Sequence, residues 1–221
     1  MSLQRNHYKW LGLMIALFYP VMMSIAGRLR SSRVQIPAYP LPAYFLLYAI
    51  PFVILLSILK YGEKEKLSSL GSIEFKPETL WLGLLIMLCN LGAVMLLGAI
   101  MLLLHITPPQ EPQWNIMLQW PLWARLLLVV WAGISEEIYF RGYGITRLQQ
   151  LTNNKWIATI LPLFLFAIYH VIFGTLYHVV FAFVGGIVLT VSYLKFKNLL
   201  ANMIGHSMFD LLFIVSLPHH S

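Results

Sequence analysis

The stretch Trp131-Ala-Gly-Ile-Ser-Glu-Glu-Ile-Tyr-Phe-Arg141 places two adjacent carboxylates and an arginine in an otherwise apolar run. A charged side chain at the centre of a bilayer costs about 3 kcal/mol on insertion scales, so an acid there usually marks a functional site. Residues four apart on a helix share a face, which predicts an ion pair between Glu137 and Arg141. Glu136 is rotated by about 100° from Glu137, so we expect it to face a different direction.

The composition outside this stretch indicates a membrane protein. Of 221 residues, 59% are hydrophobic and 10% are charged, whereas soluble domains carry about 25% charged residues. We therefore expect an all-α fold, a polytopic transmembrane helical bundle whose candidate catalytic residues lie on the late spans. The net charge of +7 does not indicate a nucleic-acid partner, because the basic residues fall in short loops, where they orient the chain and contact membrane lipid.

The apolar runs predict about seven spans, because a helix needs about 20 apolar residues to cross the hydrocarbon. The 39 residues between Lys155 and Lys195 carry no formal charge and suit two spans that turn near Phe173. A further turn is expected at 195–198. The expected spans are 10–26, 41–59, 80–104, one from about 120 through the glutamate pair, two within 156–194, and 199–217.

The loop charges predict the orientation. Eleven Lys and Arg residues fall on the N-terminal side of the spans and four on the other side. The positive-inside rule then places the N-terminus in the cytoplasm and the C-terminus outside, in a plasma (inner) membrane. The segment 61–78 is the one long charged loop, and we expect a solvated connection there rather than a weak amphipathic segment along the membrane interface. Cys89 is the single cysteine, which excludes an internal disulfide and a Cys-based metal cluster, and we expect it to be packed.

Two later segments add polar residues at matching depth. His206 and Asp210 are four residues apart and share a helix face. If the fourth helix continues to a turn at 152–154, then Glu136 and His170 both lie 17 residues from Asn153. That places both about 25 Å from the turn on antiparallel helices and keeps Arg147 in water. The helix could instead end early at Gly142 or Gly144.

Each piece also has a simpler reading. A lone intramembrane histidine is often a hydrogen-bonded packing residue, a Glu-Arg pair can brace a transporter, and Asp210 can merely pair with His206. His206 lies 8 residues beyond Asn198, about 12 Å into the membrane from its own turn, which agrees with the level of Glu136 and His170. This agreement in depth favours a joint site.

Three motifs occur in order on successive late segments: Glu136-Glu137-x-x-x-Arg141, Phe166-x-x-x-His170 and His206-x-x-x-Asp210. This ordered set resembles the CAAX-processing and bacteriocin-processing (CPBP, or Abi) family of intramembrane endopeptidases, over roughly 120–217. The Phe183-x-x-Gly186 stretch is similar to the small-residue packing of that family. The chain accordingly divides into generic N-terminal helices, 1–119, and a catalytic helical core, 120–221.

The resemblance implies a role for each motif residue. Glu136 would be the general base that activates water, and His170 and His206 would position that water or stabilise the transition state. Glu137 and Arg141 would be structural. Asp210 stands where the family often has Asn, read as an oxyanion donor. An ionised Asp repels an oxyanion, so Asp210 would either donate as a protonated acid or orient His206 as the acid of a triad does.

Several alternatives stay open at this stage. Zinc is possible, with Glu136, His170 and His206 as ligands, although we expect a glutamate protease without a cofactor. A transporter or a non-catalytic immunity or scaffold protein would use the same charges differently. The expected partner is a membrane-anchored peptide or protein, and the sequence does not show whether it is prenylated.

Overall fold

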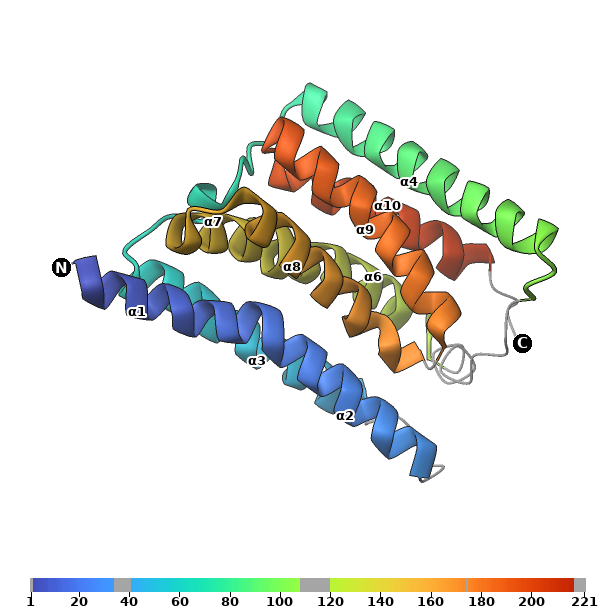
Figure 1. Ribbon diagram of the computed structural model, residues 1–221, viewed down its shortest axis with the longest axis horizontal. Coiled ribbons are helices and arrows are strands. Elements are labelled where there is room, and N and C mark those ends of the chain that lie inside the picture. Colours follow the sequence, from blue (N-terminus) through green and yellow to red (C-terminus); the bar gives the residue numbers. More distant parts are fainter. Residues whose placement is uncertain (1, 34–40, 108–119, 174, 217–221) are drawn as a thin grey trace.

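The computed structural model describes residues 2–33, 41–107, 120–173 and 175–216, and the all-α prediction is confirmed over them. Within these residues all elements except one short 3-10 helix form seven continuous helical rods, whose arrangement is shown in Figure 1. In chain order the elements are α1 Ser2–Leu13, η1 Met14–Phe18, α2 Tyr19–Arg33, α3 Leu41–Ser57, η2 Ile58–Gly62, η3 Leu67–Leu70, α4 Pro77–Leu103, α6 Leu122–Glu136, η4 Glu137–Ile145, α7 Thr146–Thr152, α8 Lys155–Tyr169, η5 His170–Phe173, α9 Leu176–Phe196 and α10 Leu199–Ser216.

Three helices are long and apolar enough to cross a membrane unaided: Leu3–Leu29, Pro77–Leu103 and Leu176–Phe196. The helices Leu46–Gly62, Lys155–Tyr169 and Leu199–Phe213 are apolar but shorter. These apolar helices indicate an integral membrane protein. The number of spans and their orientation remain predictions.

The rods pack side by side in layers (Figure 1). α4 lies on one edge and packs against α9 and α10, and α10 also packs against α6. The N-terminal helices lie along the opposite edge, where α2 contacts α8. The late helices α6, α8, α9 and α10 therefore occupy the middle of the bundle, with other helices on both sides.

The fourth rod runs unbroken from Leu122 to Thr152. Gly142 and Gly144 do not end it, because the chain there takes a π-helical path over Glu137–Ile145. Asn153 ends the rod with a left-handed conformation at φ 52°, and the Asn154 side chain caps α8 by accepting from Trp156 N at 2.9 Å. The predicted turn at 152–154 is confirmed, and so is the turn at 195–198, where Lys197 is left-handed. Gly174 of the turn near Phe173 lies outside the described residues.

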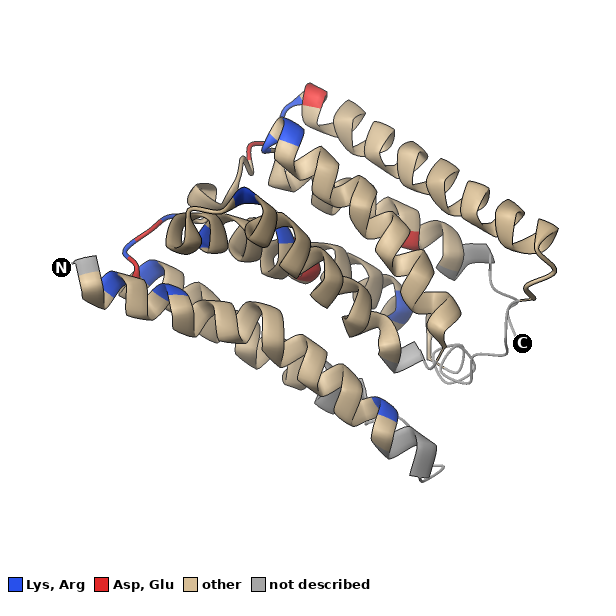
Figure 2. Cartoon of the chain, viewed as in Figure 1, with Lys and Arg blue, Asp and Glu red and all other residues tan. Residues whose placement is uncertain are grey.

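The segment 61–78 is largely exposed, as expected of a solvated connection, but two of its residues are buried. Glu63 and Leu70 are fully buried, and the Leu70 carbonyl accepts from the Tyr193 hydroxyl at 2.6 Å. Arg147, expected in water, is 1% exposed, and its Nε lies 2.6 Å from Glu63 Oε2. Neutralisation of each charge by the other is what makes this burial tolerable. Figure 2 shows that charged residues gather at this end of the rods.

Cys89 is also placed differently from the expectation. It is exposed on α4, beside outward-facing apolar side chains such as Leu85 and Leu88. A row of exposed apolar groups is unfavourable in water and suits contact with lipid tails, so we expect this face of α4 to contact lipid.

Candidate active site

Glu137 lies at the centre of a buried polar cluster formed by η4 and α10. Its Oε1 accepts from Arg141 Nη1 at 2.8 Å and lies 3.0 Å from His206 Nδ1. Its Oε2 accepts from Asn202 Nδ2 at 3.0 Å. All four side chains are buried. The structure therefore forms the expected Glu137–Arg141 pair and adds two partners from a helix about 65 residues further along the chain.

The contact with Glu137 fixes the state of the His206 ring. An ionised carboxylate only accepts hydrogen bonds, so His206 Nδ1 carries the proton of this bond. In the neutral imidazole the lone pair then lies on Nε2. That nitrogen faces two other acids, Glu136 Oε2 at 3.9 Å and Asp210 Oδ2 at 3.6 Å.

Glu136 and Glu137, expected to face different directions, lie against different atoms of the same side chain, His206. Glu136 lies near Nε2 of the imidazole and Glu137 near Nδ1, because α10, which carries His206, packs against both α6 and η4. Glu136 is buried, and its Oε2 has no hydrogen-bond partner within the described part of the chain. A buried carboxylate oxygen without a donor is costly, so this position suits a water molecule or a substrate.

Asp210 is the most accessible of the three acids around His206. Its side chain is 32% exposed, against 9% for Glu136 and 0% for Glu137. The cluster is therefore open at Asp210 and closed at Glu137, where Arg141 and Asn202 surround the carboxylate.

Phe166 connects His170 to this cluster. Its ring centroid lies 4.7 Å from that of His170 and 6.1 Å from that of His206, and the Arg141 guanidinium stacks on it at 3.9 Å. His170 ends α8, with its Nδ1 2.8 Å from the Phe166 carbonyl. The structure thus gathers Glu136, His206 and Asp210 directly and places His170 next to them across Phe166.

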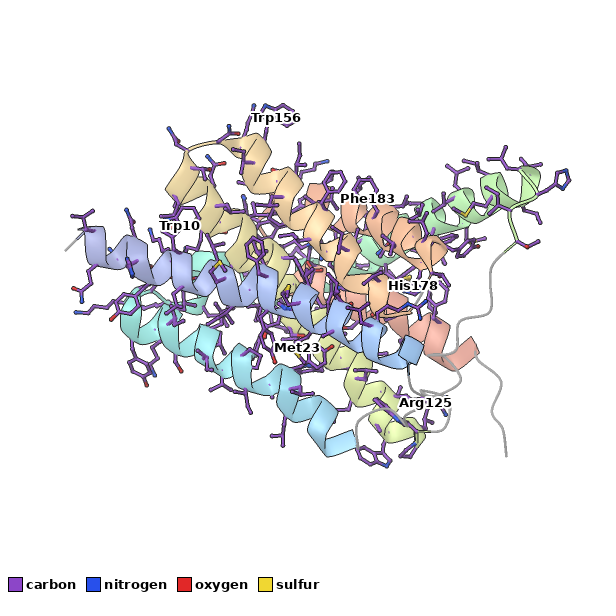
Figure 3. All side chains as sticks on the ribbon, turned by 60° about the horizontal axis from the view of Figure 1, so that its bottom comes forward. Trp10, Met23, Arg125, Trp156, His178 and Phe183 are labelled. Atoms are coloured by element: carbon purple, nitrogen blue, oxygen red, sulfur yellow. The ribbon has the colours of Figure 1, made fainter. Side chains whose placement is uncertain are left out.

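His178, on the first turn of α9, extends the row of rings. Its ring stacks on that of His170 with centroids 5.7 Å apart, and Figure 3 labels it at the start of that helix. No motif spacing in the sequence ties His178 to the other residues, so its position beside His170 is known from the structure alone.

Close helix packing positions the cluster. Gly186 on α9 lets Phe166 approach, since an added Cβ would lie 2.9 Å from the ring, and its carbonyl accepts from Arg141 Nη2 at 3.4 Å. Gly133 on α6 does the same for Ser207 on α10, where a Cβ would lie 2.1 Å from Oγ. These contacts hold the helices that carry Glu136 and His206 at the short distance that the site needs.

Asn202 is the functional candidate that the sequence reasoning missed. Its Nδ2 donates to Glu137 Oε2 and to the Leu189 carbonyl at 2.8 Å. It precedes His206 by four residues and so shares its helix face, as Asp210 does on the other side. That spacing was the available signal, but an uncharged amide carries no cost in a span comparable to that of an acid.

Metal binding receives no positive support from the geometry. Among the residues that the structure describes, no three His, Cys, Asp or Glu side chains are grouped so that they could hold a metal ion. His170 contacts the cluster through the Phe166 ring. The zinc alternative therefore has to be tested chemically.

Comparison with known proteins places the cluster in a family. A search of curated proteins and a search of solved structures each found no match. Residues 118–212 match the family described as type II CAAX prenyl endopeptidase Rce1-like, and this range includes every residue of the polar cluster. The C-terminal part of this chain therefore carries an Rce1-like domain of the CAAX-processing endopeptidase family.

Proposed function

We propose that this protein is an intramembrane endopeptidase that hydrolyses a peptide bond with water activated by Glu136. The family match supports a protease acting on membrane-associated proteins or peptides in general. The choice of Glu136 as the base rests on one observation, its buried Oε2 atom without a partner beside His206 Nε2.

In this proposal the attacking water lies between Glu136 and His206. Hydrogen bonds from water to these groups are about 2.8 Å long, so one water can contact both Glu136 Oε2 and His206 Nε2, which lie 3.9 Å apart. Glu136 takes a proton from this water, and the resulting hydroxide attacks the carbonyl carbon. When the carbon–nitrogen bond breaks, Glu136 returns the proton to the leaving amine.

The remaining residues hold and shape this arrangement. Glu137 orients His206, and Arg141 and Asn202 hold Glu137. Asp210 and His170 line the site beside the ring, where they contact or position the substrate.

The substrate that fits the family's description is a membrane-anchored protein ending in a CAAX sequence with a prenylated cysteine. Cleavage after that cysteine removes three residues. Partial exposure of Asp210 gives such a chain a way to the buried pair of Glu136 and His206.

The test is cleavage of a prenylated CAAX peptide by the purified protein in proteoliposomes. Removal of a general base typically costs 10²–10⁴-fold, so Glu136→Gln should lose about that much turnover with an unchanged melting temperature. Glu74→Gln, which changes an exposed acid of the 61–78 segment, is the matched control and should cleave normally. Near-normal cleavage by Glu136→Gln would disprove the mechanism.

Cleavage measured in the presence of a chelator tests whether the activity depends on a metal ion. We expect cleavage to continue in excess chelator. Loss of activity in chelator together with recovery on added zinc would replace the metal-free mechanism with a zinc-dependent one.

A further inference from the structure

Arg125 is a buried cation outside the cluster described above. It lies in the first turn of α6 and is 6% exposed, although its charge suggested a place in a loop. Its Nε and Nη1 atoms are buried and lack a hydrogen-bond partner in the described part of the chain. A buried guanidinium without an acceptor is strongly unfavourable, so these atoms are suited to an anion.

The N-terminus of α6 adds to the same environment. The N-cap residue is Pro121, and no side chain caps the helix. The first amides of a helix and its dipole favour a negative group at this end, and side chains lean toward the N-terminus of their helix. Figure 3 shows Arg125 at this end of the rod. Helix end and guanidinium together offer several donors to one carboxylate or phosphate.

The position of Arg125 relative to Glu136 bears on which anion would bind there. The two residues are eleven positions apart in α6, which is regular α-helix over this range. Eleven residues turn the helix by three turns plus about 20° and advance it by about 16 Å. Arg125 and Glu136 therefore lie on one face.

The spacing matches the length of the fragment that the proposed reaction removes. Three extended residues span about 10 Å. Contacts of about 3 Å at each end, one to the attacking water and one to the arginine, bring the total to about 16 Å. On the basis of the proposed function, we propose that Arg125 and the N-terminus of α6 bind the terminal carboxylate of the substrate and so set cleavage three residues from its end.

The experiment compares a prenylated peptide ending in a free carboxylate with the same peptide ending in an amide, in nanodiscs of neutral phosphatidylcholine. A hydrogen bond to a charged group is worth about 10–100-fold in affinity. The wild type should favour the acid by that factor in kcat/KM, mainly through KM. Arg125→Gln should cleave acid and amide equally, at the wild-type rate for the amide.

Two variants control for loss of charge and loss of fold. Lys195→Gln removes one positive charge from an exposed site in the last turn of α9 and should keep the full preference for the acid. Arg125→Lys keeps the charge but not the paired donors of a guanidinium, and it should give an intermediate preference. Equal cleavage of acid and amide by the wild type, or an undiminished preference in Arg125→Gln, would overturn the proposal.

A binding measurement distinguishes failure of the carboxylate site from failure of the proposed function. Labelled acid and amide peptides bound to Glu136→Gln report the carboxylate site without turnover. A preference for the acid that disappears in Glu136→Gln/Arg125→Gln supports the site even if no peptide is cleaved. Cleavage without any preference leaves the function intact and refutes the site.

Anionic lipid is the other source of a phosphate or carboxylate group at this end of the helix. Phosphatidylglycerol added to the nanodiscs should leave the preference for the acid unchanged. If Arg125→Gln instead alters only melting, and only in phosphatidylglycerol, then Arg125 binds a lipid headgroup and the carboxylate assignment is wrong.

Discussion

At the scale of single residues, the site is organised around the imidazole of His206. Three carboxylates surround this ring, and they differ in what else they contact. Glu137 is bonded to Arg141 and Asn202, Asp210 is partly exposed, and Glu136 Oε2 has no donor within the described residues. This distribution separates an acid that holds the ring from an acid that is free to accept a proton.

The structure bears on the two roles expected for Asp210, a protonated donor or the acid that orients His206. A triad acid is needed where nothing else sets the tautomer of the histidine, but here Glu137 bonds to Nδ1. Asp210→Asn should therefore keep kcat within about tenfold, against a loss of roughly 10⁴-fold when a triad loses its orienting acid. The measurement is kcat with a parallel thermal melt. A collapse of kcat at unchanged melting temperature would show that Asp210 is the orienting acid.

The buried ion pair should be strongly coupled. Removing one partner leaves an unpaired charge, which typically costs 3–5 kcal/mol, so Glu137→Ala and Arg141→Ala should each lower detergent stability severely. The double variant should lose less than the sum of the two. The exposed pair Glu74 and Lys76 is the control, for which each variant should cost at most about 1 kcal/mol. Additive losses at Glu137 and Arg141 would contradict the coupling.

At the scale of elements, the distance between Glu136 and His206 depends on how closely α6 packs against α10. A Cβ at Gly133 would lie 2.1 Å from Ser207 Oγ and 3.1 Å from Ser207 N. Rotation of the hydroxyl relieves the first contact but not the second, so Gly133→Ala should push the helices apart. We expect a cost of about 1–3 kcal/mol and a fall in kcat, measured by melting and by cleavage.

Gly92 on α4 provides the matched control for that prediction. An added Cβ there has no neighbour within 4 Å, so Gly92→Ala should keep full activity and gain up to about 1 kcal/mol of helix propensity. Equal behaviour of the two alanine variants would show that the close approach at Gly133 does not position the site.

At the scale of the whole molecule, Glu63 joins the N-terminal half to the Rce1-like domain. It accepts from Arg147 and from the Tyr143 hydroxyl, and its carbonyl accepts from Arg5 Nε at 2.9 Å. Glu63→Ala should therefore lower the melting temperature clearly, by the unpaired burial of Arg147. Glu65→Ala, which breaks a more exposed pair with Arg5, should change it little. Similar melts for both variants would show that the buried link does not matter.

Contacts within one helix were predictable from the sequence, whereas contacts between helices were not. The contacts within one helix, Glu137 with Arg141 and His206 with Asp210, follow from the four-residue spacing alone. The contacts of Glu63 with Arg147 and of Asn202 with Glu137 depend on which rods become neighbours. Helix periodicity does not determine that choice, so burial of Glu63 within the 61–78 segment was not predictable from its charge.

Cys89 provides a native probe of how the molecule lies in the bilayer. It is exposed and close to the midpoint of α4, Pro77–Leu103, a helix about 40 Å long at 1.5 Å per residue. If α4 crosses the hydrocarbon as its length suggests, a spin label or fluorophore on this thiol reports the centre of the membrane. Its quenching by lipids labelled at different acyl depths would then give the immersion depth of the unmutated chain.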